Sequence, residues 1–324
     1  MDDTNKLQVL YSSVKKMRTT VAKAILRDTV LTGRQIDVAS ERGRTVTTWF
    51  HSSGTKNAPI LFDLHGGGFV MGDPRKSDAF CACIAKAWKV NVISVGYSLA
   101  PENPYPAALE DVCAVLGWYR QNAADLQIDA SAIYLQGYSA GANLAFAAQL
   151  RLMKQGLDPV QGIIAHYPFF DAMTSPALKN VRDIDLPVEI MEAFNLWYVG
   201  GASASNPEIS LIFATDEEYK HFPKTMLYAV VGDCLFDEAM SIAVRMLSLG
   251  VDCKFHSVQG AYHGYIEDAV NTKVYRETSF PETRAARPAG YREAAQKYVR
   301  EALTELLGEP QDKELYQKFW ETES

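Results

Sequence analysis

The sequence predicts an α/β fold in which one mostly parallel, eight-stranded sheet is covered by helices on both faces. Eight strand-like runs alternate with helical stretches, and 48% of the 324 residues are hydrophobic, enough for a sizeable core. Only four residues separate the first two runs, which predicts an antiparallel hairpin, whereas the later gaps suit parallel crossovers. The predicted strands are 36–40, 45–51, 59–65, 91–97, 132–137, 162–167, 225–232 and 253–258.

The N-terminal segment predicts a helix with one apolar face. The pattern ends near Gly33, which favours a helix packed on the body of the protein over a coiled coil. Its apolar residues recur three and four positions apart: Leu7, Leu10, Val14, Met17, Val21 and Ile25. The helices expected to cover the sheet are 77–88, 107–121, 141–154, 238–249 and 291–307.

Two segments interrupt the alternation of strands and helices. Residues 171–222 insert about fifty residues that are rich in aromatic side chains and poor in strand patterns, which is typical of a lid over a sheet edge. Residues 271–290 are polar and turn-rich. We therefore divide the chain into N-terminal helices (1–34), a core (35–170 and 223–307), an insertion (171–222) and a C-terminal tail (308–324).

Composition excludes several kinds of function. Acidic residues outnumber Lys and Arg by 39 to 32, so the chain, with a formal net charge of −7, repels nucleic acid. The five cysteines lack C-x-x-C spacing and the N-terminus lacks a secretory pattern, which favours a cytoplasmic location. The uncharged run 130–150 is too polar for a membrane span. No metal-binding pattern is present, and we expect no cofactor.

One motif indicates a nucleophile. Residues 133–141 read IYLQGYSAG, which is a strand, the pattern G-x-S-x-G and the start of a helix. The glycines permit the close backbone approach that a sharp strand-to-helix turn needs, and this turn lifts the Ser139 hydroxyl above the carboxyl edge of the sheet. The helix N-terminus directs free amides at an anion formed there. A tight turn with a solvated serine is the alternative interpretation.

A run of glycines that begins at Gly66 follows another predicted strand. A nucleotide-binding loop is disfavoured because Met71 replaces the third glycine of G-x-G-x-x-G, and the lysine of a P-loop is missing. Bare amides here suit an oxyanion hole, in which the N–H of Gly66 or Gly67 joins that of Ala140 to bind developing negative charge. We expect His65 to hold the loop in place.

A serine nucleophile needs a base, and the base needs an acid that orients it. Among the six histidines, His263 lies on a small-residue loop after the last predicted strand, where it can reach the carboxyl edge of the sheet. Asp233 directly follows a predicted strand, whereas Asp237 and Glu238 fall in the next helix. We therefore predict a catalytic triad of Ser139, Asp233 and His263.

These motifs resemble those of the hormone-sensitive-lipase group of α/β-hydrolases, the bacterial family IV esterases. The resemblance covers 59–263 and rests on HGGG, YSLAPENPYPAALED, GYSAG, DCLFDE and YHGY, in that order. It implies an α/β-hydrolase fold with a helical cap made by the N-terminal helices and the insertion. It also implies hydrolysis of short- to medium-chain carboxylic esters without a cofactor. The site residues implied are the triad and the oxyanion donors Gly66, Gly67 and Ala140.

Three residues depart from the family's pattern. Ala142 replaces a glycine, Asn103 replaces a common histidine, and Tyr138 stands where the family has an aspartate before the nucleophile. The phenol of Tyr138 would narrow the acyl pocket, donate a hydrogen bond to substrate, or pack against the cap. The remaining aromatic residues expected to wall the pocket, or else to form ordinary cap core, are Phe169, Phe170, Phe194, Trp197 and Tyr198.

The sequence thus predicts acyl transfer from a small-molecule ester to water through an acyl-enzyme, with short- to medium-chain acyl or aryl esters as substrates. An amidase or peptidase would use the same triad. A non-catalytic receptor is the other alternative, as in the plant gibberellin receptors of this wider family, which lack the catalytic histidine. The presence of His263 favours an enzyme. A homodimer through an edge strand or the 291–307 helix is left open.

Overall fold

The computed structural model of the chain describes residues 3–180, 187–278 and 287–322, and one eight-stranded sheet runs through this part. The strands are β1 (Arg34–Ala39), β2 (Thr45–His51), β3 (Ala58–Leu64), β4 (Asn91–Gly96), β5 (Ile128–Tyr138), β6 (Gly162–His166), β7 (Lys224–Val230) and β8 (Cys253–Val258). Their order is β1-β2-β4-β3-β5-β6-β7-β8. Only the β1/β2 and β2/β4 pairs are antiparallel, so the predicted mostly parallel sheet is confirmed.

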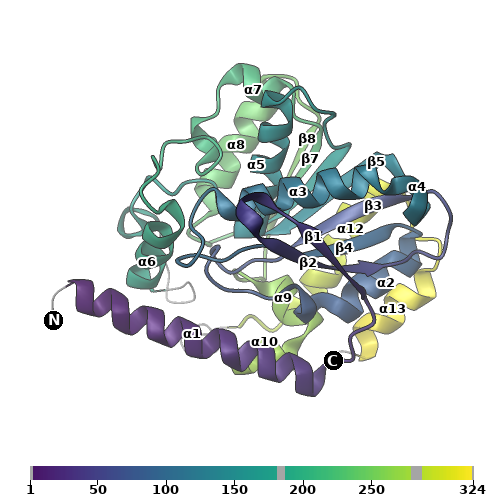
Figure 1. Cartoon of the computed structure of the whole chain (residues 1–324), viewed down its shortest axis with the longest axis horizontal. Helices are drawn as coiled ribbons and strands as arrows, with labels where there is room; N and C mark the ends of the chain where they lie inside the picture. Colours follow the sequence, from purple (N-terminus) through teal and green to yellow (C-terminus); the bar gives the residue numbers. More distant parts are fainter. Residues whose placement is uncertain (1–2, 181–186, 279–286, 323–324) are drawn as a thin grey trace.

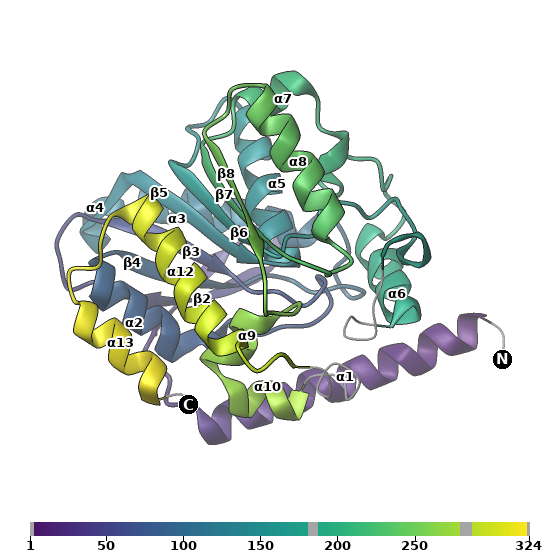
Figure 2. The same ribbon diagram turned by 180° about the vertical axis from the view of Figure 1, so that it is seen from behind.

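Helices cover both faces of this sheet. On one face lie α3 (Ala107–Gln121), α5 (Ala140–Lys154) and α8 (Phe236–Ser248), of which α3 and α5 stand in front in Figure 1. On the other face lie α2 (Asp78–Trp88), α9 (Tyr265–Val270), α12 (Tyr291–Leu307) and α13 (Lys313–Thr322), and Figure 2 shows α2, α12 and α13 in front. The five helices predicted for the core are all present.

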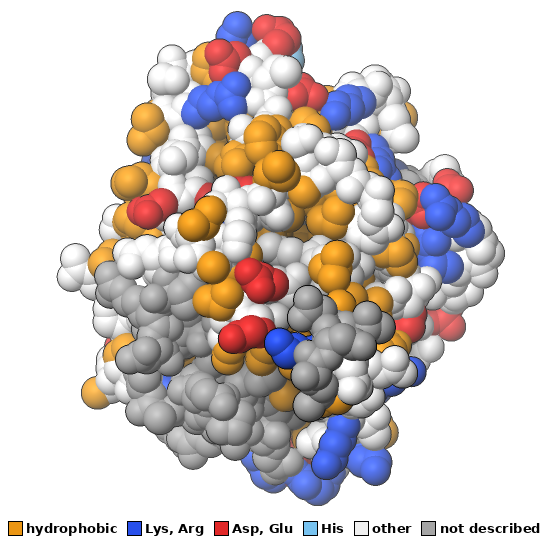
Figure 3. Space-filling view, turned by 90° about the vertical axis from the view of Figure 1, so that its left-hand side faces the viewer, with side chains coloured by type: hydrophobic (Ala, Val, Ile, Leu, Met, Phe, Trp, Pro, Cys, Tyr) orange, Lys and Arg blue, Asp and Glu red, His pale blue; other side chains and the backbone are white. Residues whose placement is uncertain are grey.

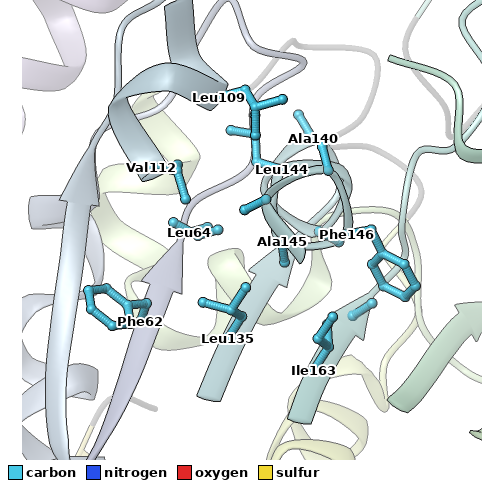
Figure 4. Packing of buried hydrophobic residues seen from close by; sticks show 14 of the residues in the cluster. Phe62, Leu64, Leu109, Val112, Leu135, Ala140, Leu144, Ala145, Phe146 and Ile163 are labelled. Carbon is cyan, nitrogen blue, oxygen red and sulfur yellow. The ribbon is translucent and has the colours of Figure 1, made fainter. Parts of the chain in front are cut away.

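The two cores follow from the alternation of side chains along the strands. In β3, Phe62 and Leu64 point into the core beneath α3 and α5, whereas Leu61 points into the core beneath α2 and α12. Both cores bury the sheet, which explains why its central strands read as nearly continuous apolar runs. Figure 4 shows the first core, where the side chains of the sheet meet Leu109, Val112, Leu144, Ala145 and Phe146.

The N-terminal segment forms one long helix, α1 (Asp3–Asp28), as the spacing of its apolar residues predicts, and the plural helices of the 1–34 division reduce to this one. It runs beside α10 (Thr272–Thr278) and α6 (Val188–Val199), as both ribbon views show (Figures 1 and 2). Ile25 and its neighbours pack on Val274 of α10, and Val14 faces Phe194 of α6 across a small apolar groove. The predicted apolar face of this helix therefore contacts two segments that are distant in the sequence.

The insertion 171–222 contains α6 and the short helix α7 (Asp216–Lys220), and its residues 181–186 lie outside the described part. Figure 3 views the molecule from the side of α6 and shows hydrophobic side chains gathered over the middle of this face. The exposed hydrophobic residues of the insertion include Met173, Leu178 and Leu196. Of the turn-rich segment 271–290, the structure describes α10 and leaves out 279–286.

The remaining elements are short. The segment predicted as a tail, 308–324, contains α13, whose Tyr316 and Trp320 are buried against α2. Helix α4 spans Ala123–Leu126, and turns of 3-10 helix occur at Glu41–Gly43, Pro74–Ser77, Pro176–Leu178 and Leu211–Phe213. No described helix has both the length and the hydropathy that a membrane span requires.

Four rings stack side by side across the face of the sheet that α12 covers. Tyr138, His166, Tyr228 and His256 are cross-strand partners on β5, β6, β7 and β8, with ring centroids 5.3, 5.3 and 4.6 Å apart. His166 is fully buried, and neither of its ring nitrogens has a hydrogen-bond partner in the described residues. Burial lowers the pKa of His166 to about 3, so the imidazole is neutral at neutral pH.

The buried imidazole predicts that acid destabilises the protein. Because its folded-state pKa lies below the ordinary value of 6.5, the stability linked to neutral His166 is present above pH 6.5 and is lost as the pH falls toward 3. A His166→Phe variant keeps a ring in the stack and has nothing to protonate. We expect its free energy of unfolding, measured in urea, to fall less between pH 7 and 5 than that of the wild type.

A control variant separates this effect from that of substitution in general. Leu157→Ala changes an exposed side chain that has no titratable group, and it should leave the wild-type pH dependence unchanged. Burial raises the pKa of Asp63 to about 6, which has the opposite effect on stability, and this contribution cancels in the comparison of variant with wild type. Equal slopes for wild type and His166→Phe would contradict the prediction.

Candidate active site

Ser139 lies at a sharp turn between β5 and α5, at the carboxyl edge of the sheet. Its backbone has φ 52° and ψ −115°, a conformation that L-residues rarely adopt. Two hydrogen bonds hold the turn: the Ser139 amide donates to the His166 carbonyl (3.0 Å), and the Phe169 amide donates to the Ser139 carbonyl (3.4 Å). The surrounding strands thus stabilise a strained backbone that presents the hydroxyl.

The two glycines of the motif are required by close backbone contacts. A Cβ at Gly137 would lie 2.4 Å from the carbonyl of Gly141, in the first turn of α5. A Cβ at Gly141 would lie 2.0 Å from the carbonyl oxygen of Leu64, at the end of β3. Both distances are far shorter than a real Cβ contact. The two glycines of G-x-S-x-G are therefore needed where β5, α5 and β3 approach one another.

The structure brings Ser139, His263 and Asp233 together. His263 Nε2 lies 2.9 Å from Ser139 Oγ, and His263 Nδ1 lies 2.7 Å from Asp233 Oδ2. The Asp233 side chain is 1% exposed and that of His263 is 23% exposed. With Nδ1–H donating to the carboxylate, Nε2 is the acceptor that faces the serine hydroxyl, which is the arrangement a general base needs.

Each partner of the serine sits on a loop after a parallel strand. Asp233 follows β7, where its amide donates to the Val230 carbonyl and its Oδ1 accepts the Leu235 amide (3.1 Å each). His263 follows β8, and the ring of Tyr167 packs edge-on against its imidazole at 5.0 Å. The backbone and ring contacts therefore hold the orientations of both side chains before any substrate binds.

Among the predicted oxyanion donors, Gly66 is not available. Its N–H donates to Glu267 Oε1 at 3.1 Å, because α9 brings this carboxylate against the glycine loop. The prediction for Gly66 is therefore wrong in this structure. The Gly67 and Gly68 amides donate to no acceptor in the described residues, and Ala140, as the first residue of α5, has no acceptor within its helix for its amide.

His65 holds the glycine loop through its own carbonyl and its ring. Tyr97 Oη donates to the His65 carbonyl, and His65 Nδ1 donates to the Gly66 carbonyl, each at 2.7 Å. Burial lowers the pKa of His65 to about 4, so the ring is neutral at neutral pH and carries its proton on Nδ1 for this bond. A Cβ at Gly72 would lie 2.2 Å from His65 Nδ1, so the loop also packs over the ring.

The structure separates the predicted pocket residues into two groups. Tyr138 and Phe170 are core: the ring of Tyr138 lies in the stack beneath the sheet edge, where its Oη accepts from Gln136 Nε2 (2.6 Å), and Phe170 packs on Phe146. Tyr138 therefore faces neither the cap nor the acyl side, because strand alternation turns it to the opposite face. This corrects all three interpretations offered for Tyr138.

The other four predicted aromatic residues lie around the glycine loop and α6. A Cβ at Gly68 would lie 2.3 Å from the Phe194 ring, so Phe194 covers the loop directly. The ring of Tyr198 stacks on Phe69 at 3.5 Å, Phe169 meets Phe69 edge-on at 5.9 Å, and Trp197 contacts Tyr11 of α1 at 5.8 Å.

Sequence reasoning missed two residues of this site, Phe69 and Glu267. Phe69 directly follows the three glycines, and its φ of 61° places its ring between Phe169 and Tyr198. Its position in the HGGGF run was the available signal. Glu267 lies four residues after His263, and nothing in its local sequence indicates the contact with Gly66. Within the described ranges, no three His, Cys, Asp or Glu side chains gather as a metal site would require.

A serine, a carboxylate and an imidazole on the loops after β5, β7 and β8, at the carboxyl edge of a mostly parallel sheet, define an α/β-type serine hydrolase. A family model described as the alpha/beta hydrolase fold matches residues 61–267, and the chain therefore belongs to the α/β-hydrolase family. The relatives found by sequence confirm the resemblance to its hormone-sensitive-lipase-like esterases.

Two curated relatives illustrate the similarity. Esterase LipI of Mycobacterium tuberculosis is 31% identical over 211 residues, which cover 64% of this chain and 66% of that protein, just under two thirds of it. The 3-O-acetylpapaveroxine carboxylesterase CXE2 of Papaver somniferum is 31% identical over 245 residues, 68% of this chain and 78% of that protein.

Solved structures share the fold. A thermostable esterase from Pseudomonas putida ECU1011 superposes with a TM-score of 0.72 at 21% identity, covering 88% of this chain and 89% of that one. A fungal esterase from Rhizomucor miehei gives a TM-score of 0.69 at 27% identity, covering 88% and 92% of the two chains.

The contact of Gly141 with β3 predicts a large effect of a small change. A methyl group in Gly141→Ala must displace the backbone of α5 or of Leu64, so we expect a loss of about 3 kcal/mol in unfolding free energy. Any folded fraction should lose about 100-fold in activity toward p-nitrophenyl acetate, because the turn carrying Ser139 moves.

Gly117→Ala is the matched control for this change. Gly117 lies in α3 and a Cβ there would meet nothing within 4 Å, so alanine should raise stability by about 0.5–1 kcal/mol. Urea denaturation checks both variants. Equal stabilities for the two would show that the motif glycine has no steric role.

Proposed function

We propose that this α/β-hydrolase is a carboxylesterase that hydrolyses short- to medium-chain acyl or aryl esters through an acyl-enzyme. The observation that carries the proposal is the continuous hydrogen-bonded line from Asp233 through His263 to the Ser139 hydroxyl. The esterase names of the relatives support the same reaction class.

In the proposed mechanism, His263 Nε2 removes the proton of Ser139 as Oγ attacks the ester carbonyl. Asp233 stabilises the imidazolium and keeps its tautomer. The imidazolium then protonates the leaving alcohol or phenol, and the serine ester remains. His263 next removes a proton from water, whose oxygen attacks this ester, and the serine is regenerated as the acid departs.

The oxyanion of each tetrahedral intermediate needs amide donors beside Ser139. We assign this role to Gly67 and Gly68 together with Ala140, because Glu267 already occupies the amide of Gly66. The Ala140 amide opens α5, so the helix dipole also favours negative charge there. Donors held in place before reaction lower the barrier because they need no reorganisation.

The cap and the acyl pocket are part of the same proposal. Helix α6 covers the glycine loop through Phe194, and α1 packs against α6 along an apolar groove. We propose that α1 and the insertion together form the cap, and that Phe169, Phe194, Trp197 and Tyr198 wall the pocket. We also propose a cytoplasmic location for the protein and a homodimer as its assembly.

Replacement of the nucleophile tests the mechanism. Ser139→Ala should reduce the hydrolysis of p-nitrophenyl butyrate by at least about 10⁴-fold, because only binding and oxyanion stabilisation remain. Its thermal unfolding should match that of the wild type. Substantial turnover by a folded Ser139→Ala protein would exclude the proposed nucleophile.

Two further assays separate the alternatives. A receptor on this fold would not react with an alkyl phosphonate, whereas the proposed enzyme should form one covalent adduct, lost in Ser139→Ala and detected by mass spectrometry. Comparison of kcat/KM for p-nitrophenyl esters with kcat/KM for the matching p-nitroanilides tests whether the protein is an amidase. A kcat/KM as high for the anilides as for the esters would favour an amidase.

We propose that the apolar groove between α1 and α6 extends the acyl pocket. Each methylene that it buries contributes about 0.8 kcal/mol, so for the proposed short- to medium-chain preference kcat/KM should rise from acetate to about hexanoate and fall for laurate. In Trp197→Ala we expect the maximum to move to longer chains, because this ring lines the groove.

Leu247→Ala removes an exposed side chain of α8 and should leave the profile unchanged. The measurement is a series of p-nitrophenyl esters graded by acyl length, assayed with each protein. A profile that is flat, or that is identical in wild type and Trp197→Ala, would show that the groove does not bind the acyl chain.

A further inference from the structure

Glu267 connects two loops of the site that lie far apart in the sequence. It lies on α9, which begins two residues after His263, and its Oε1 accepts the amide of Gly66 at 3.1 Å across 201 positions of sequence. One side chain thus links the loop that carries the catalytic histidine to the glycine loop after β3.

The carboxylate of Glu267 packs closely against this loop. A Cβ at Gly66 would lie 2.6 Å from Glu267 Oε2 and 3.1 Å from the carbonyl oxygen of Tyr138. Gly66 is therefore small because the carboxylate and the end of β5 approach it from two sides. Tyr138, which stands where the related motif has an aspartate, supplies only its carbonyl oxygen here, and the carboxylate beside the glycine loop is that of Glu267.

The contacts of the two peptide groups that flank Gly66 define the direction of the next amide. In the first group, the His65 carbonyl accepts from Tyr97 Oη and the Gly66 N–H donates to Glu267. In the second group, the Gly66 carbonyl accepts from His65 Nδ1. A planar trans peptide directs its N–H opposite to its C=O, so the Gly67 amide points away from the His65 ring.

We infer that Glu267 is a positioning residue for ester hydrolysis: by accepting the Gly66 N–H, it fixes the glycine loop so that the Gly67 amide is held for the oxyanion. This inference rests on the function proposed above and adds a residue to it. Because α9 follows directly after His263, the same contact also fixes the distance between the oxyanion donors and the base.

The surroundings of Glu267 indicate that its role toward Gly66 is to accept a hydrogen bond, and that its negative charge is less important for this role. The carboxylate lines a small cavity with Asp63, His65, Asp73, Lys76 and Tyr138. Burial raises the pKa of Glu267, while Lys76, the Gly66 amide and His263 act in the opposite direction. A protonated acid and a primary amide both retain a carbonyl oxygen that can accept the Gly66 N–H. Glutamine should therefore replace Glu267 with little loss.

Two variants of similar volume test this inference. Glu267→Met removes the acceptor, and we expect kcat for p-nitrophenyl butyrate to fall about 10- to 100-fold while KM stays within about twofold, because the oxyanion forms only after binding. Glu267→Gln should stay within about threefold of the wild-type kcat. Glu293→Ala, a change at an exposed position of α12, is the control and should have wild-type kinetics.

A second readout reports on the oxyanion site directly. A trifluoromethyl ketone adds to the serine and forms a hemiketal whose oxygen is negatively charged. Its inhibition constant should rise in Glu267→Met by the same factor as kcat falls, and should stay near the wild-type value in Glu267→Gln. Thermal unfolding of each variant identifies any loss of kcat that comes from misfolding. If Glu267→Met does not fold, the test is the kcat of Glu267→Gln, which should stay within about threefold of the wild-type value.

The outcomes separate this inference from the proposed function. Wild-type kinetics in Glu267→Met, a loss confined to KM, or a Glu267→Gln variant as impaired as Glu267→Met would each overturn the positioning role and leave the esterase proposal intact. A wild-type protein without esterase activity or phosphonate labelling would instead overturn the proposed function.

Discussion

The close contact between the first turn of α5 and the end of β3 is the constraint on which the rest of the site depends. Gly141 lies against the carbonyl oxygen of Leu64, and only a residue without a Cβ fits there. This contact holds the strained backbone of Ser139 and brings its hydroxyl beside the glycine loop that follows β3. Strain at one residue is stable because two strands and a helix define its position.

Parallel strands make the site possible because their carboxyl ends share one edge. The loops after β3, β5, β7 and β8 carry the glycine amides, Ser139, Asp233 and His263. These loops are also joined to one another beyond the triad, since Glu267 of α9 holds the amide of Gly66. The loop that carries His263 and the glycine loop are therefore joined by a hydrogen bond, which explains how side chains on separate loops can keep a common geometry.

The two sides of this edge have different chemistry. Above it, α6 places Phe194 over the glycine loop and Tyr198 over Phe69. These rings cover the loop with apolar side chains. Below it, the rings of Tyr138 and His166 stack on each other and are buried. The departure of Tyr138 from the related motif is therefore accommodated beneath the sheet and away from the acyl side, because residues adjacent along a strand face opposite ways.

The sequence by itself determined the sheet and its helices and singled out Ser139, Asp233 and His263 as the proposed triad, because strand alternation, helical spacing and a glycine-flanked turn are encoded in a few consecutive residues. It left undecided the helix α13 and the position of Phe69, and it assigned Gly66 and Tyr138 wrongly. The tertiary structure decided these, since whether an amide is free or a ring faces substrate depends on partners distant in the chain. Gly66 is the clearest case: its amide is taken by Glu267, 201 positions away.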